Sequence, residues 1–332
     1  MTAGRVVQLA FCTTDLASTV RRYVEGFGFA DAGGRILWGR RVAKIQQLGE
    51  DTTFALQWLV GRQELVQLEF FQHSVPEQAL LPDDWRPSDL GWTRFGIAVP
   101  DFDATLSRLG GLGVTTIGEP ILHKGLHRAS FRDPDLGIIV EILEDGAALP
   151  GGIRPRHFAL SPAIVYAGCS VADLEAARAL YLGAFGLVES EETLHTAEME
   201  GLFSLPGARR EGFVASSGEV FLEVSRYLEP VGRPREEGRL LSDQGFMNIA
   251  IGYRDGTSLE AAIGRAEALG CTLNAPLPKR PAPATYLTDT EGASVEALCI
   301  PREYEAFYGF APSTLFPPPA LWPSTTTPPA DG

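Results

Sequence analysis

Cysteine is scarce in this chain, and its four residues (Cys12, Cys169, Cys271 and Cys299) are far apart in sequence. No C-x-x-C pair occurs, which argues against a disulfide framework and a zinc ribbon. Long apolar runs are also missing: no stretch reaches the roughly 18 to 20 uncharged residues of a membrane helix. The N-terminus lacks an apolar h-region and a small-residue cleavage site, so the sequence predicts no signal peptide.

Basic residues are the minority charge, with 28 Lys and Arg against 42 Asp and Glu and a net charge of −14. An acidic surface repels phosphate, so nucleic acid and anionic membranes are poor partners. No Walker loop, dinucleotide fingerprint or Gly-x-Ser-x-Gly elbow occurs. We therefore expect a cytoplasmic protein that handles a small molecule, as a monomer or a homodimer.

What the chain does contain is an internal repeat. Four segments share one order: an alternating strand, an Asp, helix-spaced apolar residues and then Gly. An Asp at a helix start accepts hydrogen bonds from free backbone amides and suits the positive end of the helix dipole. The sequence thus predicts four strand–helix units, whose helices begin after Asp15, Asp101, Asp173 and Asp255.

Each unit also ends in an apolar strand that carries one glutamate. Glu69 and Glu223 are 154 residues apart, and Glu141 and Glu296 are 155 apart. The near-constant offset indicates that a pair of units, itself the product of one duplication, was duplicated again. It predicts two domains of two units each.

The expected domains cover residues 1–148 and 161–303. Between them lies a linker at 149–160, rich in turn-forming residues. A Pro-rich tail at 304–332 follows, with six prolines between Pro317 and Pro329. The tail is expected to be extended and solvated, with a docking role as the alternative.

This order of elements resembles the vicinal oxygen chelate (VOC) superfamily, which contains glyoxalase I, bleomycin-resistance proteins and extradiol dioxygenases. The resemblance extends to about Pro301 and rests on the segments around Asp15 and Asp101 and on the Asp-Pro-Asp-x-Gly run that ends at Glu141. It implies an α+β fold of four βαβββ modules, paired into two glyoxalase/bleomycin-resistance/dioxygenase-like domains. In such domains a sheet curls around a cup, and a metal sits inside the cup.

Strand alternation indicates which side chains would face the cups. Each expected row starts with a functional residue, namely Gln8, Arg94, Tyr166 or Asn248, and continues with small residues. Small side chains on a concave face favour a ligand cavity. The alternative is that they admit a close-packed neighbouring strand.

In the superfamily, the ligands come from this first position and from the glutamate of the last strand. In the expected first domain these positions hold Gln8, Glu69, Arg94 and Glu141, which resembles the Gln, Glu, His, Glu set of glyoxalase I with Arg94 in place of His. Arginine offers no lone pair to a metal. We therefore expect these four residues to contact substrate, with Arg94 and the glutamates neutralising each other.

In the expected second domain the positions hold Tyr166, Glu223, Asn248 and Glu296, without the two histidines of the extradiol dioxygenases. The prediction is that no cofactor is needed, although Glu223, Asn248 and Glu296 are donors that a hard ion such as Mg²⁺ or Mn²⁺ accepts. Two facing glutamates raise one another's pKa, so that one acts as a base and the other as an acid. These four residues are the predicted catalytic set.

None of the five histidines falls in a ligand position, and His195 lies in an acidic segment read as helix or loop. The favoured function is lyase or isomerase proton transfer on an oxygenated aromatic or polyketide-like compound, with Tyr166 or Asn248 holding an enolate oxygen. Two alternatives stay open. One is a metal-dependent glyoxalase-like or dioxygenase-like enzyme with atypical ligands, and the other is a non-catalytic binding or resistance protein.

Overall fold

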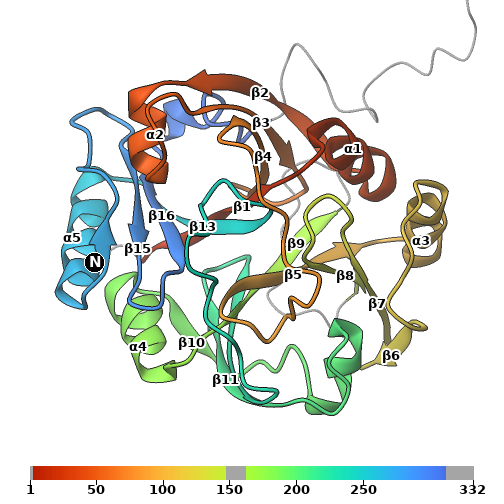
Figure 1. The fold of residues 1–332 in the computed structure, drawn as a ribbon. Coiled ribbons are helices and arrows are strands. Elements are labelled where there is room, and N and C mark those ends of the chain that lie inside the picture. Colours follow the sequence, from red (N-terminus) through yellow and green to blue (C-terminus); the bar gives the residue numbers. More distant parts are fainter. Residues whose placement is uncertain (1–2, 147–161, 312–332) are drawn as a thin grey trace, which may run out of the picture.

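The computed structural model describes residues 3–146 and 162–311, which form two eight-stranded sheets (Figure 1). Sheet A contains, in spatial order, β14 (Thr272–Leu273), β15 (Ala284–Thr288), β16 (Ser294–Cys299), β13 (Gly245–Tyr253), β1 (Arg5–Cys12), β4 (Gln67–Val75), β3 (Thr53–Val60) and β2 (Ala30–Trp38). Sheet B contains β10 (Val188–Ser190), β11 (Arg209–Ser216), β12 (Phe221–Glu229), β9 (Ala163–Ser170), β5 (Gly91–Val99), β8 (Ile139–Glu144), β7 (Leu126–Arg132) and β6 (Ile121–His123). The predicted α+β fold of four modules is confirmed.

The helices follow the first strand of each module, as the sequence predicts. They are α1 (Leu16–Arg21), which continues as the π-helical η1 (Arg22–Phe27), α3 (Phe102–Gly111), α4 (Leu174–Arg178), which continues as the π-helical η2 (Ala179–Ala184), and α5 (Gly256–Ala268). Asp15, Asp101, Asp173 and Asp255 cap them, and each side chain accepts a backbone N–H of the first turn. Shorter elements are α2 (Arg40–Gln46) and the 3₁₀ turns η3 (Ala197–Phe203) and η4 (Arg302–Tyr304).

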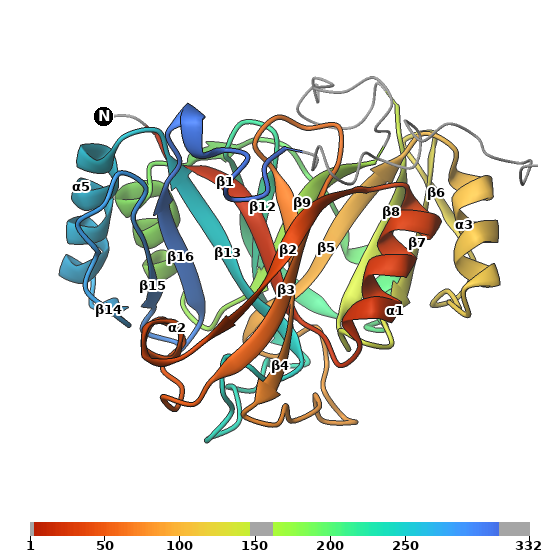
Figure 2. The ribbon, with the colours of Figure 1, turned by 90° about the horizontal axis from the view of Figure 1, so that it is seen from above.

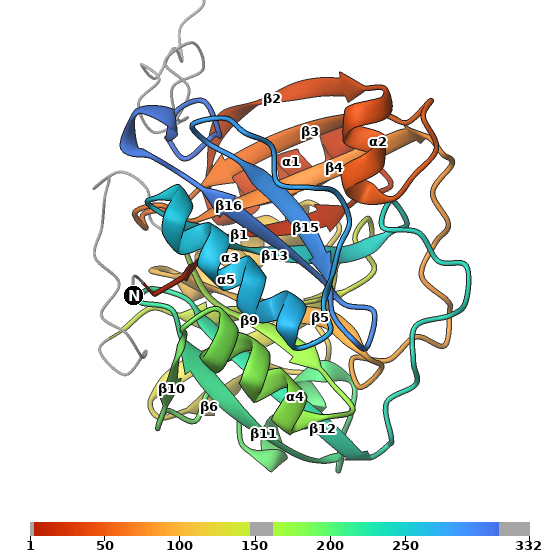
Figure 3. The same cartoon turned by 90° about the vertical axis from the view of Figure 1, so that its left-hand side faces the viewer.

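Helices pair within each half of the chain. In the first half, α3 packs against η1, where Arg108 Nε donates to Gly26 O at 2.9 Å (Figure 2). In the second half, α5 packs against η2, where Arg265 Nε donates to Ala184 O at 3.0 Å (Figure 3). No helix within the described ranges is long and apolar enough to cross a membrane.

Strands, by contrast, pair across the halves. In sheet A, β1 of the first module pairs antiparallel with β13 of the fourth. In sheet B, β5 of the second module pairs antiparallel with β9 of the third. Each sheet therefore combines one module from each half, and the expectation that each half closes its own cup is wrong. Strand alternation is the same whichever strand lies alongside, so the sequence pattern does not specify the partner.

One hydrophobic core joins the two sheets. Phe11 of β1 lies at the centre, with ring centroids 4.8 Å from Phe95 of β5 and 4.5 Å from Phe246 of β13. These rings, with the buried sides of the helices, form a continuous cluster. The opposite face of each sheet curls around a separate set of buried side chains. We call the set on sheet A, which includes Phe54, Trp58, Phe71, Met247 and Tyr286, cup A, and the set on sheet B, which includes Val165, Tyr166, Leu194 and Phe221, cup B.

The expected linker at 149–160 and most of the expected tail lie outside the described residues. The described start of the tail packs on sheet A. Phe310 is 2% exposed, and a Cβ built on Gly309 would come within 2.5 Å of the Trp58 ring. This segment therefore covers part of cup A.

Candidate functional site

Cup A brings together four of the predicted residues: Gln8 of β1, Glu69 of β4, Asn248 of β13 and Glu296 of β16. Small residues form the floor between them, as the sequence predicts. Ala10 is paired with Asn248 on one side and with Glu69 on the other. Ala250 is paired in the same way with Gln8 and Glu296. The four polar side chains therefore surround a floor of two alanines.

Cup B holds the other four: Arg94 of β5, Glu141 of β8, Tyr166 of β9 and Glu223 of β12. The predicted grouping of Gln8 and Glu69 with Arg94 and Glu141 is wrong, because β1 and β5 lie in different sheets. The predicted grouping of Asn248 and Glu296 with Tyr166 and Glu223 is wrong for the same reason.

Glu69 is held on both of its oxygens. Trp58 Nε1 donates to Glu69 Oε1 at 2.7 Å, and the Gln8 amide donates to Oε2. Gln67 Nε2 in turn donates to Gln8 Oε1 at 2.8 Å. This chain of donors fixes the Glu69 carboxyl group within the cup.

The two glutamates of cup A have unusual acidities. Burial raises the pKa of Glu69 well above its ordinary value of 4.5, and the charge of Glu296 raises it further. Burial raises the pKa of Glu296 to about 7, while the positive charge of Arg280 opposes the shift. Near neutral pH the pair can therefore both hold and accept a proton.

Asn248 is fully buried, and neither Nδ2 nor Oδ1 has a hydrogen-bond partner among the described residues. The Tyr286 phenol lies beside it, but the two groups do not meet at hydrogen-bonding geometry. A buried polar group without a partner costs about 1–3 kcal/mol, so a water molecule or a ligand is needed to satisfy this amide. Burial raises the pKa of Tyr286 well above its usual value, and the charges of Glu296 and Glu69 add to the shift, so the phenol stays a proton donor.

The donor set of cup A also bears on the metal that the resemblance implies. Gln8, Glu69, Asn248 and Glu296 follow the Gln, Glu, His, Glu order of glyoxalase I, with Asn248 in the histidine position. All four offer oxygen, which suits Mg²⁺ or Mn²⁺, and the unpartnered Asn248 Oδ1 fits such an ion. Within residues 3–146 and 162–311, no group of three or more His, Cys, Asp and Glu side chains could hold a metal.

Aromatic and apolar side chains form the walls of cup A, from Phe54, Trp58, Phe71, Met247 and Tyr286. The Arg35 guanidinium lies 5.2 Å from the Trp58 ring centroid and 4.0 Å from that of Phe307. Such walls suit a planar, apolar body that carries a few oxygen atoms.

In cup B, side chains of opposite charge pair with one another. Arg94 Nη2 donates to Glu223 Oε2 at 2.9 Å, so the predicted neutralisation of Arg94 occurs, but with a glutamate of the third module. Tyr166 donates to Glu141 Oε2 at 2.6 Å, and Arg128 Nε lies 3.0 Å from Glu141 Oε1. All of these side chains are buried. Each of these two glutamates has a positively charged partner, whereas Glu69 of cup A is held by the neutral donors Trp58 and Gln8.

His195, which the sequence placed in an acidic helix or loop segment outside the ligand positions, lies at the centre of cup B. Its Nδ1 is 2.9 Å from Glu223 Oε2, and its Nε2 is 2.8 Å from Glu141 Oε2. Both ring nitrogens face carboxylates, which only accept, so these two contacts favour the imidazolium form. Burial lowers the pKa of His195, but the two glutamates outweigh burial and the net shift is upward.

The segment that carries His195 fills the cup. Leu194 and Phe203 pack inside it, and Glu200 of η3 accepts hydrogen bonds from Arg210 and, at 2.8 Å, from the Tyr227 hydroxyl. The sequence did not predict this role, because the acidic segment 189–200 is typical of an exposed segment and its pattern does not distinguish the buried Glu200 from the exposed glutamates.

Sequence reasoning missed the two aromatic polar groups of cup A, Trp58 and Tyr286. Each is the antiparallel partner of a glutamate: Trp58 is paired with Glu69, and Tyr286 with Glu296. An assignment of the hairpin register β3–β4 and β15–β16 would have found both, since directly paired side chains share one face of a sheet.

Solved structures with this fold are numerous. Glyoxalase I from Zea mays matches with a TM-score of 0.59 and 19% identity, over 90% of this chain and 92% of that one. A candidate dioxygenase from Bacillus subtilis matches with a TM-score of 0.61 and 13% identity, over 92% and 87%. No protein-family model and no curated protein sequence matches the chain. The chain has the VOC fold along nearly its whole described length.

Proposed function

We propose that this protein is an enzyme of the VOC superfamily that transfers protons on a small oxygenated compound bound in cup A. The observation that carries the proposal is the pair Glu69 and Glu296, two buried carboxyl groups in one cup with raised pKa values. The unpartnered amide of Asn248 supports it, because a substrate oxygen would satisfy that group. The VOC fold, shared with glyoxalase I, supports the class of enzyme.

The roles follow from the contacts. Glu296, with a pKa of about 7, is the base that removes a proton from a carbon next to a carbonyl group. The C–H electron pair moves into the enolate, and Asn248 Nδ2 and the Tyr286 hydroxyl donate to its oxygen. Glu69, whose pKa burial raises well above its ordinary value, is the acid that returns a proton. Tyr286 takes the part that the sequence assigned to Tyr166, because Tyr166 lies in cup B.

A hard divalent ion is compatible with the same residues. Gln8, Glu69, Asn248 and Glu296 would hold it through oxygen, and when bound it would polarise the substrate oxygen. With the ion bound, both glutamates would be ionised ligands, and Asn248 Nδ2 and the Tyr286 hydroxyl would still orient the substrate oxygen.

Cup B serves as internal support in this proposal. Its carboxylates are engaged by Arg94, Arg128, Arg210 and His195, and its volume is filled by the segment around η3. A group already ion-paired in a filled site is a poor base, since the paired charge lowers its pKa. Glu223 shows this effect: burial acts to raise its pKa, but the charges of His195 and Arg210 hold it well below the ordinary value.

The substrate class follows from the walls of cup A. Phe54, Phe71, Trp58 and Tyr286 offer flat apolar surface, with His73 beside Phe54 and Arg35 beside Trp58 as polar neighbours. An aryl ketone, an aromatic hydroxyketone or a polyketide-like ring matches this distribution of polar and apolar surface.

Deuterium exchange tests the proposal even when the final product is unidentified. The protein is incubated in D₂O with a panel of aryl ketones and aromatic hydroxyketones, and wash-in next to the carbonyl is followed by NMR. Wild-type protein should accelerate exchange for some members, and Glu296→Gln should lower that rate by about 10²-fold or more. Glu260→Gln, an exposed change on α5, is the control.

Two results would contradict the proposal. One is exchange that is unchanged in Glu296→Gln. The other is a panel member that raises the melting temperature through cup A and is returned without exchange or conversion, because that behaviour belongs to a binding protein. Metal analysis of the same purified protein, before and after dialysis against a chelator, decides whether an ion takes part.

A further inference from the structure

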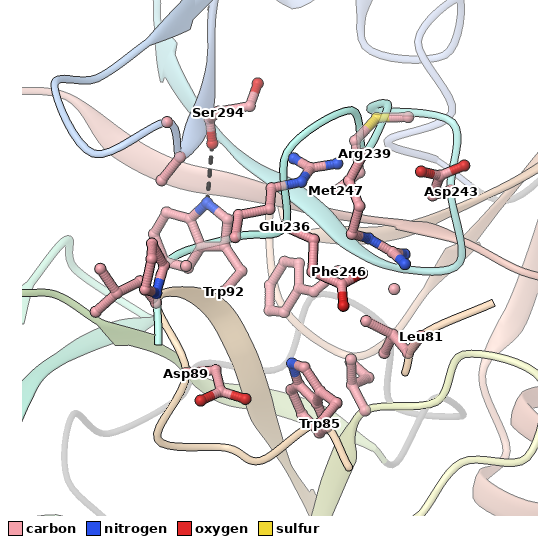
Figure 4. A pocket seen from close by; sticks show the side chains of 18 of the residues that line it. Leu81, Trp85, Asp89, Trp92, Glu236, Arg239, Asp243, Phe246, Met247 and Ser294 are labelled. Atoms are coloured by element: carbon pink, nitrogen blue, oxygen red, sulfur yellow. Dashed lines mark hydrogen bonds between the residues drawn. The ribbon is translucent and has the colours of Figure 1, made fainter. Parts of the chain in front are cut away.

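A cavity of about 220 Å³ lies between the two sheets, at the ends where β5 and β13 begin (Figure 4). None of the eight residues predicted for the two cups lines it. Its rim is formed by the connections 76–90 and 230–244, which join the modules within each half. Gln78 Nε2 donates to Ser242 O at 2.7 Å and Leu90 N donates to Arg233 O at 2.8 Å, so the rim is held together across the halves.

The floor of this cavity is aromatic. Trp92 and Phe246 lie with ring centroids 5.6 Å apart, and Trp85 and Leu81 face them across the opening (Figure 4). Trp92 and Phe246 are 154 residues apart, the same interval as Glu69 and Glu223, so they are corresponding residues of the duplicated halves. Two flat rings at a duplicated position provide a surface for stacking a planar ligand.

A buried hydroxyl also lines the cavity. Ser294 is 2% exposed, and its Oγ has no hydrogen-bond partner among the described residues. Its backbone oxygen accepts from Trp92 Nε1 at 2.8 Å, which fixes its position beside the aromatic floor. An unpartnered buried hydroxyl is destabilising unless a ligand or water satisfies it.

The charged groups at the rim differ in their hydrogen-bond and ion-pair partners. Three of the four lining carboxylates already accept hydrogen bonds on both oxygens: Asp89 from Arg86 and Arg233, Asp243 from backbone N–H groups, and Glu291 from backbone N–H groups. Glu236 is the fourth and is exposed. Arg235 and Arg239 donate only to backbone carbonyls, and neither forms an ion pair within the described ranges. Two guanidinium groups thus line the rim without a direct ion pair, although the charge of Asp243 acts on Arg235.

We propose that this cavity is a second small-molecule site, which adjoins cup A at Met247 but contains none of its polar residues, and that it binds a planar aromatic compound bearing a carboxylate or a similar anionic group. The ring lies against Trp92 and Phe246, the anionic group faces Arg235 and Arg239, and Ser294 Oγ donates to a polar substituent. The site is independent of the chemistry proposed for cup A.

Isothermal titration calorimetry on the full chain tests this site with 2-naphthoate and its neutral amide, 2-naphthamide. Naphthoate should bind more tightly, because only the acid offers a charge to the two arginines. Arg235→Gln should weaken naphthoate binding about tenfold, the usual effect of losing a charged hydrogen bond, and leave naphthamide unchanged. Glu236→Gln should tighten naphthoate binding, because it removes an exposed carboxylate of the rim that repels the anionic ligand.

Both substitutions are on an exposed connection, so the fold should tolerate them, and thermal unfolding checks that it does. Glu296→Gln locates the site: naphthoate affinity should not change, because Glu296 lies in cup A. The proposal is overturned by an absence of saturable naphthoate binding, by equal affinity for acid and amide, by insensitivity to Arg235→Gln, or by weakening in Glu296→Gln.

Discussion

Trp58 and Glu69 face each other across β3 and β4, and the indole Nε1 donates to Glu69 Oε1 at 2.7 Å. A donor to a carboxylate favours its ionised form, so this contact opposes the effect of burial on the pKa of Glu69. Trp58 therefore limits the rise in the pKa of Glu69.

Replacing Trp58 tests this relationship. Trp58→Phe should raise the pKa of Glu69, followed by ¹³C NMR of its carboxyl carbon, because the donor is lost while burial remains. It should also destabilise the fold by about 1–3 kcal/mol, the cost of a buried acceptor left without its partner. Trp38→Phe is the matched control, since Trp38 is 71% exposed. A Glu69 pKa that falls or stays constant in Trp58→Phe would contradict this account.

The raised pKa of Glu296 predicts a pH dependence of stability. Its value of about 7 in the folded protein lies above the ordinary 4.5, so protonation favours the folded state. The stabilisation is complete below about pH 4.5 and is lost as the pH rises through 7. Glu296→Gln cannot titrate, so its stability relative to the wild type should rise by about 3 kcal/mol between pH 4 and pH 8. Urea unfolding at several pH values measures the difference, and a constant difference would refute the assignment.

His195 predicts a second pH dependence, in cup B. Its folded-state pKa is raised above 6.5 because Glu223 and Glu141 outweigh burial. The imidazolium therefore stabilises the fold fully below about pH 6.5, and this contribution is lost as the pH rises through the raised pKa. Arg94, Arg128 and Arg210 also face these glutamates.

The measurement compares wild type with His195→Gln by urea unfolding from pH 6 to pH 9. The stability advantage of the wild type should shrink as the pH rises. An advantage that grows over this range would show that the ring is neutral and that its two contacts need another explanation.

The two tyrosines at the cups separate the roles of cup A and cup B. Tyr286→Phe should lower turnover about tenfold or more, because a donor to the developing oxyanion is lost. Tyr166→Phe should leave turnover near the wild-type value and lower stability, because Tyr166 donates to Glu141 within the filled cup. The reverse pattern would place the chemistry in cup B, where Tyr166 and Glu223 lie.

The sequence alone predicts the four modules, but it does not predict which modules pair to form each sheet. Asp15, Asp101, Asp173 and Asp255 act locally as helix caps, so a short-range pattern identifies them. Whether β1 lies beside β13 or beside β5 depends on contacts between distant residues, which alternation along one strand does not encode. As a result, the sequence placed Asn248 and Glu296 in a different site from Gln8 and Glu69, although it identified all four as candidate site residues.

The role of His195 depends on the same long-range information. Its neighbours in sequence are acidic and polar, which is typical of an exposed segment. Its partners, Glu141 and Glu223, are 54 and 28 residues away and come from two different modules. Only the pairing of the second module with the third explains why a histidine at this position is buried.

The pairing of modules also decides which residue stands where glyoxalase I has its histidine. The sequence favours Arg94, whereas cup A places Asn248 there, between Glu69 and Glu296. Asn248→His should therefore increase the uptake of Zn²⁺ or Mn²⁺, because it adds an imidazole to two carboxylates and an amide. Arg94→His is the matched control and should bind no additional metal, since cup B already neutralises its carboxylates with Arg128, Arg210 and His195. Inductively coupled plasma mass spectrometry after dialysis gives the metal content of each variant without reference to activity. Metal gained by Arg94→His and not by Asn248→His would show that the ligand positions are assigned to the wrong cup.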